Sequence, residues 1–382
     1  MVLLAVIAML GTLGMHILVP ALPGMASDFH TTPATMQLAI TSYMIGLAAG
    51  QIFYGPVSDR FGRRPVLLAG LVLYIIGMAL ALPMMSIGFL LFARVLQALG
   101  ACGAFVLGRA MVRDGATPES AAGRMAVLTM AMTISPAIAP GVGYLIASSF
   151  GWHAIFLLLF AVGVLLFLLC WALLPETNLH RVSSLGIGGM VRNYGKLFGS
   201  RSFMGYTLGG STIIISSYVF LGALPHLVTD VLGRPAAEAT YGYAAIVLGM
   251  TLGAYVAKRL SRRLAPLAGV KAGAMVAIIG AVLLLLASLN APGFLSMVLP
   301  VVIYSIGAGM ISPNAISGAM GRDPTMFGAT SSLYGVIQMG WGAFITAVPS
   351  MIGSQSPLTV ATILSICALA GIGMLCQIPR QS

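Results

Sequence analysis

Two ionisable side chains lie inside stretches that are otherwise apolar: His16 and Arg94. A guanidinium is costly in an apolar medium unless it faces a partner or water, and imidazole titrates near neutral pH. No Asp or Glu lies in the middle of any apolar stretch, so these two side chains are the candidates to carry charge or a proton inside these stretches. Simpler interpretations stay open: Arg94 can brace helices by binding carbonyl oxygens, and His16 can be satisfied by a neighbour such as Thr12.

The polar segment GPVSDRFGRR (residues 55–64) places Asp59 between Gly55 and Gly62. The two glycines permit close approach and a tight turn. Asp59 can face a helix N-terminus and a guanidinium, for which we expect Arg113. A cluster that breaks when two halves of a molecule move apart would act as a gate, whereas a plain topology signal would explain the arginines but not Asp59. The predicted gate comprises Gly55, Asp59, Arg60, Gly62, Arg63, Arg64 and Arg113.

The composition excludes most soluble functions. Apolar residues make up 59% of the 382 residues, and Asp, Glu, Lys and Arg only 7%. The net charge of +11 does not indicate a nucleic-acid partner, because the basic residues lie between apolar runs. The four cysteines lie in apolar segments without a CxxC pair, and no P-loop is present. We therefore expect neither an enzyme nor a bound cofactor or metal, and an all-α membrane protein in contact with the lipid bilayer.

Charge, Pro and Gly divide the chain into twelve predicted transmembrane helices. They cover residues 1–22, 36–57, 66–84, 88–111, 123–148, 153–174, 204–228, 237–258, 267–289, 294–318, 327–350 and 356–378. We expect two six-helix bundles, 1–174 and 202–382, joined by a cytoplasmic linker at 175–201. With both termini cytoplasmic, seventeen of the nineteen Lys and Arg fall on the inner side. Two similar halves suggest a binding site between them near the midplane.

The 55–64 segment resembles the loop signature of the major facilitator superfamily. VPALPGMASDF, ARVLQALGA, ISPAIAPGVG and GATSSLYGVIQ narrow the resemblance to the drug:proton antiporter-1 group and its Bcr/CflA drug-resistance branch. The resemblance implies a monomeric, proton-coupled antiporter in a bacterial inner membrane. Its substrates would be small amphipathic drugs such as bicyclomycin or phenicols, exchanged for protons by alternating access.

The same resemblance suggests roles for particular residues. Arg94 matches the fourth-helix Arg that the superfamily links to proton transfer. Residues 135–143 resemble the antiporter motif, with Pro136, Pro140, Gly141 and Gly143 in place. Ala139 and Tyr144 replace usual glycines, so a packing kink without directional meaning is an equal alternative.

His16 departs from the branch, which usually has an Asp four residues before the Pro of PALP. Without that carboxylate, neutral or anionic substrates become more plausible than lipophilic cations. Polar residues on other spans are candidates for the substrate cavity, although each can equally be a packing residue. These are Tyr43, Gln51, Gln97, Thr129, Thr133, Tyr218, Asn314 and Gln338.

Other functions are weighed against the exporter. A dedicated proton-coupled exporter of a metabolite, such as an amino acid, carboxylate or siderophore, would use the same fold. An intramembrane enzyme would need an HExxH, paired aspartates or a Ser–His arrangement, none of which the sequence contains. A channel fits poorly with a gate motif in one half.

Overall fold

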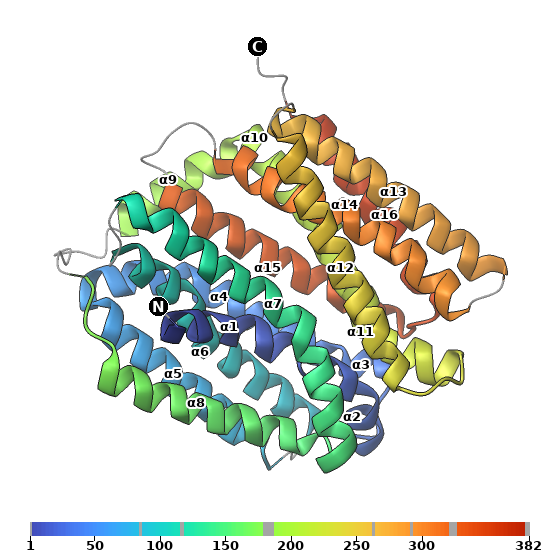
Figure 1. The fold of residues 1–382 in the computed structure, drawn as a ribbon, viewed down its shortest axis with the longest axis horizontal. Coiled ribbons are helices and arrows are strands. Elements are labelled where there is room, and N and C mark those ends of the chain that lie inside the picture. The colour runs from blue at the N-terminus through green and yellow to red at the C-terminus, as the bar shows by residue number, and fades with distance from the viewer. Residues whose placement is uncertain are drawn as a thin grey trace. The chain divides into compact units, whose positions relative to one another are not determined.

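The computed structural model describes residues 2–83, 86–114, 118–178, 187–261, 264–290, 293–320 and 327–378. Every regular element in these ranges is a helix (Figure 1). Eleven helical segments of the described chain are long and apolar enough to cross a membrane. They coincide with eleven of the predicted spans, and the remaining prediction, 123–148, falls on the helix α7, whose side chains are described only in part.

The chain forms two compact units. Unit 1 contains residues 1–30 and 39–188, and unit 2 contains 31–38 and 189–382. The main boundary lies inside the expected linker, but the short segment 31–38 belongs to unit 2, which the sequence did not indicate. The expected linker also contains an amphipathic helix, α9 (Ile187–Gly199), where only a polar connection was predicted.

Unit 1 is built from helices of the N-terminal half. They are α1 (Val2–His16), the 3-10 turn η1 (Val19–Ala21), α2 (Leu22–Asp28), α4 (Leu38–Phe61), α5 (Arg63–Ala81), α6 (Ile87–Asp114), α7 (Pro118–Phe150) and α8 (His153–Leu173). Figure 1 shows α5 packed beside α6 and α8.

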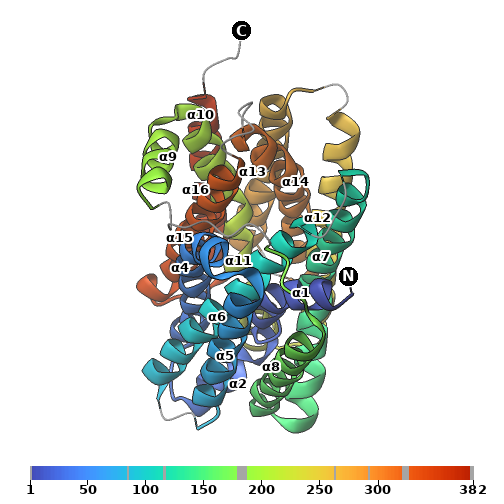
Figure 2. The ribbon, with the colours of Figure 1, turned by 90° about the vertical axis from the view of Figure 1, so that its left-hand side faces the viewer.

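Unit 2 begins with the short helix α3 (Pro33–Met36), which Thr32 caps by accepting a hydrogen bond from the Thr35 amide at 3.1 Å. The others are α10 (Arg201–Met204), the π-helical turn η2 (Gly205–Gly209), α11 (Gly210–His226), a second π-turn η3 (Leu227–Val231), α12 (Ala237–Leu260), α13 (Pro266–Asn290), α14 (Phe294–Met320), α15 (Phe327–Ile352) and α16 (Pro357–Cys376). Figures 1 and 2 show α12, α13 and α14 side by side, with α16 on α13.

The first predicted span is not one helix. Residues 1–22 were expected to run continuously, but α1 ends at His16 and a turn leads into η1 and α2. Pro20 has no N–H to donate to the carbonyl of His16 four residues earlier, so the helical ladder stops there. The break leaves carbonyl oxygens of the last turn of α1 without helical partners.

Candidate functional site

Arg94 lies on α6, is fully buried, and contacts the broken end of α1. Its Nη1 donates a hydrogen bond to the carbonyl oxygen of Gly14 at 3.0 Å, and its Nε donates to that of Ala39 on α4 at 3.2 Å. Nη1 also donates to Oε1 of Gln97, one turn along α6. Nη2 has no acceptor among the described residues. The guanidinium therefore joins three helices of unit 1 and keeps one donor group unused.

Tyr43 completes this cluster. Its ring centroid lies 4.2 Å from the guanidinium carbon of Arg94, and its hydroxyl donates to the carbonyl oxygen of Gly11 at 3.0 Å. A Cβ at Gly14 would lie 2.7 Å from that hydroxyl oxygen. Only glycine at position 14 lets α1 approach Tyr43 this closely. Two of the predicted cavity residues, Tyr43 and Gln97, are thus brought together around Arg94.

His16 is the last residue of α1 and is 2% exposed. Its Nδ1 donates a hydrogen bond to the carbonyl oxygen of Thr12 at 2.7 Å, because a carbonyl can only accept. This bond agrees with the simpler interpretation, in which a neighbour such as Thr12 satisfies His16 within the helix. His16 also lies two residues from Gly14, whose carbonyl Arg94 binds, so both candidates for proton coupling belong to the break in the first span.

The antiporter-like segment packs on the same break. Gly143 of α7 approaches so closely that a Cβ there would lie 1.9 Å from the carbonyl oxygen of Ile17. Pro136 and Pro140 lie inside α7, which continues through both. Gly141 follows in the same helix. The side chains of Thr129 and Thr133, also on α7, lie outside the described residues.

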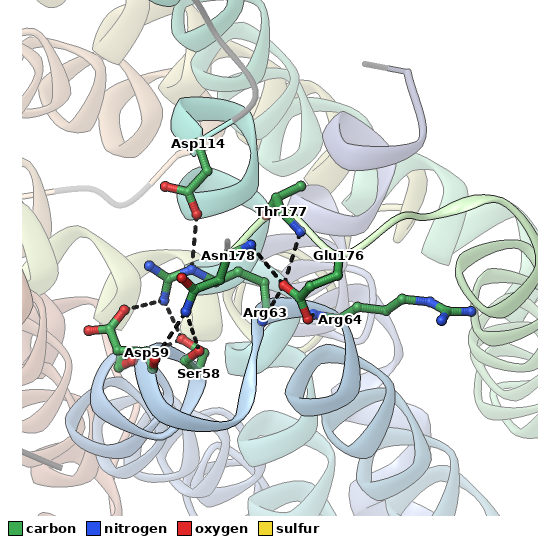
Figure 3. Close-up of polar contacts among 9 residues, drawn as sticks. Ser58, Asp59, Arg63, Arg64, Asp114, Glu176, Thr177 and Asn178 are labelled. Carbon is green, nitrogen blue, oxygen red and sulfur yellow. Dashed lines mark hydrogen bonds and ion pairs between the residues drawn. The ribbon is translucent and has the colours of Figure 1, made fainter. Parts of the chain in front are cut away.

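A second polar cluster surrounds Arg63 at the junction of α4 and α5 (Figure 3). Its Nη1 lies 2.6 Å from Oδ1 of Asp59, and its Nε lies 3.1 Å from Oδ2 of Asp114 at the end of α6. Nη1 also donates to the hydroxyl of Ser58. Arg63 is 7% exposed, so these acceptors satisfy a nearly buried charge. The described partner of Asp59 is therefore Arg63, and Asp114 is a member that the sequence analysis missed.

The remaining predicted gate residues differ in their placement. Gly62 has φ of 103°, the left-handed conformation that a tight turn before α5 requires. Gly55 lies within α4, and a Cβ there would meet no described atom within 4 Å, so the expected close approach does not occur among the described residues. Arg60 lies over the ring of Phe61, 5.2 Å from its centroid. The side chain of Arg113 lies outside the described residues, so its pairing with Asp59 stays a prediction.

Glu176, which follows the end of α8, contacts the junction of α4 and α5 through the first residues of α5 (Figure 3). Its carboxylate accepts hydrogen bonds from the backbone amides of Arg63 at 2.9 Å and Arg64 at 3.2 Å. Partial burial acts to raise the pKa of Glu176, but these bonds and those from the amides of Asn178 and Thr177 lower it below its usual value. Glu176 thus caps the N-terminus of α5, where Gly62 provides no side-chain cap.

Neighbours of Glu176 extend the connection. The Nδ2 of Asn178 donates to the carbonyl oxygens of Ser58 at 3.2 Å and Asp59 at 3.0 Å. The Nη2 of Arg64 donates to the carbonyl oxygen of Trp171 on α8 at 2.6 Å. The sequence signal for these contacts is the polar run ETN (residues 176–178) after the sixth predicted span, which by itself indicates only a linker.

The other predicted cavity residues with described side chains belong to both units, and Asn314, Tyr218 and Gln338 are in unit 2. Asn314 on α14 donates to the carbonyl oxygen of Met310 at 2.9 Å and lies against Gly269 of α13. Tyr218 on α11 and Gln338 on α15 are partly exposed. Gln51, in unit 1, is buried on α4.

Three long-range hydrogen bonds of unit 2 were not predicted. The indole nitrogen of Trp341 donates to the hydroxyl of Thr212 at 2.8 Å, joining α15 to α11. The amide nitrogen of Gln355 donates to Oε1 of Gln37 at 2.5 Å and to the carbonyl oxygen of Pro33 at 3.2 Å. Gln37 thereby secures the segment 31–38 to the C-terminal part of the chain. No group of three or more metal-ligating side chains occurs in the described ranges.

Comparisons with known proteins agree with this architecture. The family model of the Major Facilitator Superfamily matches residues 4–349. The bicyclomycin resistance protein homolog of Haemophilus influenzae is 26% identical over 94% of this chain and 90% of its own length. The chloramphenicol resistance protein of Pseudomonas aeruginosa is 30% identical over 92% of this chain and 83% of its own length. A crystal structure of a D-xylose–proton symporter superposes with a TM-score of 0.78 at 18% identity, covering 99% of this chain and 98% of the symporter.

Proposed function

Since the chain belongs to the major facilitator superfamily of multi-pass membrane transporters, we propose that it exports small amphipathic compounds in exchange for protons. The drug-resistance names of its relatives support this direction and substrate class. We place it in the bacterial inner membrane as a monomer, with both termini in the cytoplasm. Two six-helix bundles would alternate access to a site near the midplane.

The observation that carries the proposal is the Arg94 cluster. A fully buried guanidinium without a carboxylate partner is costly in a membrane protein, and such groups usually serve function. Its unused Nη2 can bind an anionic or electron-rich group that arrives with the substrate or forms on proton transfer. Because Arg94 holds the carbonyl of Gly14, a change in its contacts would act directly on the break beside His16.

The acidic residues of unit 1 whose side chains the structure describes are engaged in other contacts; Glu176, for example, accepts hydrogen bonds from the backbone amides at the start of α5. Asp28 accepts a hydrogen bond from the indole of Trp152 at 2.7 Å, and Asp59 and Asp114 bind Arg63. His16 is therefore our candidate proton carrier, with Arg94 setting the electrostatics around it. A site with positive charge and no carboxylate favours neutral or anionic substrates, which also keeps a dedicated exporter of carboxylate metabolites as the second candidate.

The Arg63 cluster is our candidate for the cytoplasmic gate. It ties α4, α5 and α6 through ion pairs that can break without disturbing the helices themselves. Its partners Asp59 and Asp114 come from two different helices of unit 1, so a movement of those helices within the unit would break the bonds that they share through Arg63.

Reconstituted vesicles test the function directly. With an acidic lumen and the chain inserted with its cytoplasmic side outward, we expect chloramphenicol to accumulate in the lumen and to leave when an ionophore collapses the gradient. Equal accumulation of chloramphenicol with and without the pH gradient would contradict proton exchange. A thermal-shift panel of phenicols, lipophilic cations, amino acids and carboxylates separates the drug exporter from the metabolite exporter, because the true class stabilises the protein on binding.

A further inference from the structure

Unit 2 contains a pocket of about 380 Å³ where the end of α12, the start of α13 and the last turns of α14 meet. Figures 1 and 2 show these three helices side by side. The polar part of its lining consists of Lys258 and Ser261 from the α12 end and Asn314 and Ser317 from α14. Pro266, the first residue of α13, closes one wall. The volume lies within the range of small-ligand sites.

The described lining of this pocket contains one basic residue, Lys258, and no acidic residue. The Lys258 side chain is exposed and makes no ion pair with a described residue. The acidic residues after position 188 are Asp230, Glu238 and Asp323, of which the last lies outside the described ranges. Glu238 is in the first turn of α12, and the twenty residues from it to Lys258 span about 30 Å of helix. Asp230 lies in η3, before that first turn, and binds Nδ1 of His226, so neither described acid of unit 2 neutralises Lys258.

In unit 1, acidic side chains neutralise the basic residue at the corresponding helix junction. There the junction of α4 and α5 meets the end of α6 through Arg63, whose charge Asp59 and Asp114 balance. The segment AKRLSRRLAP at 257–266 repeats the basic character of GPVSDRFGRR at 55–64. On α14, however, the neutral residues Asn314 and Ser317 face this junction. An anion in the pocket would supply negative charge that the described residues of unit 2 do not provide at this position.

The hydrogen-bonding groups fit an anion with several oxygens. Ser261 and Ser317 line the pocket, and the first amides of α13, which have no partner within a helix, follow Pro266. The Ser261 hydroxyl donates to the carbonyl oxygen of Lys258 at 2.9 Å and can turn toward a stronger acceptor. The C-terminal carbonyls of α12 oppose an anion, so among the described lining residues the ammonium group of Lys258 is the decisive contact.

We propose that this pocket binds a phosphate group that links α12 to α14, as Asp114 links α6 to α5 in unit 1. Positive charge places this end of unit 2 at the cytoplasmic membrane surface, where both phospholipid headgroups and free phosphate are present. The proposal concerns a structural anion and does not depend on the transported substrate.

The test uses the full chain in nanodiscs of phosphatidylcholine, with three additions: phosphatidylglycerol, inorganic phosphate, or chloride at the same ionic strength. Two quantities are measured for wild type, Lys258→Gln and Lys258→Arg. They are the unfolding temperature and the amount of bound lipid, the latter by native mass spectrometry. Arg259→Gln is the matched control, because Arg259 adjoins Lys258 but donates to the hydroxyl of Tyr255 at 2.6 Å and does not line the pocket.

We expect phosphatidylglycerol to stabilise wild type, Lys258→Arg and Arg259→Gln. Its affinity should fall about ten-fold in Lys258→Gln, the effect of losing one charge-assisted hydrogen bond. Stabilisation by inorganic phosphate alone, with the same dependence on Lys258, would support the site and identify free phosphate as the source. The proposal is overturned if neither phosphate source stabilises wild type more than chloride does. It is also overturned if Lys258→Gln and Arg259→Gln respond alike, since the attraction would then belong to the whole basic surface.

Discussion

The Nε of Arg63 donates to Oδ2 of Asp114 at 3.1 Å while Nη1 of the same guanidinium lies 2.6 Å from Oδ1 of Asp59. One nearly buried cation therefore serves two carboxylates from different helices. Removing either carboxylate leaves the other pair in place, so the two acids can be tested separately.

We predict that Asp59→Asn lowers the transport rate about ten-fold, equivalent to about 1.4 kcal/mol on the barrier, with substrate affinity unchanged. The Asp59 side chain is 48% exposed, so its pair contributes little to folding and its loss should affect the gate instead. Asp114→Asn should lower both transport and stability, because that side chain is only 19% exposed. Vesicle uptake, ligand binding and thermal unfolding separate the effects.

Glu238→Gln is the control for both variants, because Glu238 belongs to unit 2 and pairs with Arg234, which is not part of the Arg63 cluster. Unchanged uptake by Asp59→Asn at normal protein levels would remove Asp59 from the gate.

We predict that Glu176 makes stability depend on pH in the acidic range. Its pKa is lower in the folded protein than its usual value, so the ionised form is stabilised by folding. That stabilisation is fully present above the ordinary Glu value of about 4.3 and is lost as pH falls through the lower folded value. As pH is lowered from about 7 to about 3, the unfolding temperature should therefore fall more steeply for wild type than for Glu176→Gln. Parallel curves would show that backbone capping by Glu176 does not contribute.

Spans and motifs were readable from the sequence because membrane helices are long, apolar and bounded by charge. Eleven described spans coincide with the predicted ranges for this reason. The break after His16 was less apparent, although Pro20 and Pro23 both lack the amide that a continuing helix needs.

Partners of the motif residues were harder to predict than the motifs. Asp59 and Arg63 are four residues apart, and their pairing follows from local geometry once the turn at Gly62 is known. Asp114 and Glu176 lie 51 and 113 residues from Arg63, and only the packed helices bring them together. The assignment of segment 31–38 to unit 2 likewise depends on the long-range contact between Gln37 and Gln355.

We predict opposite effects for two glycine substitutions. Gly14→Ala should destabilise the protein by about 1–3 kcal/mol, because its Cβ would lie 2.7 Å from the Tyr43 hydroxyl oxygen. Gly55→Ala should stabilise it by about 0.5–1 kcal/mol, since Gly55 is helical and has open space. Denaturant unfolding of both variants provides the measurement. Equal effects would mean that the close contact between α1 and Tyr43 relaxes freely.

The last prediction separates the two roles of Arg94, bracing and proton coupling. Arg94→Lys keeps a positive charge, but one ammonium cannot reproduce the separate bonds from Nε to Ala39 and from Nη1 to Gly14. Two transport modes are compared in the same vesicles: accumulation driven by a pH gradient, and exchange of labelled for unlabelled substrate without a gradient.

If Arg94 takes part in coupling, Arg94→Lys and Arg94→Ala should lose gradient-driven accumulation by at least about ten-fold, while exchange persists in the Lys variant. If it only braces the helices, both modes should fall together with the unfolding temperature, because the carbonyls of Gly14 and Ala39 lose their donors. His16→Gln is the companion variant, since an amide can still donate to the Thr12 carbonyl that His16 binds at 2.7 Å. Loss of accumulation with retained exchange in His16→Gln would assign the proton to His16, whereas wild-type accumulation would leave it a packing residue.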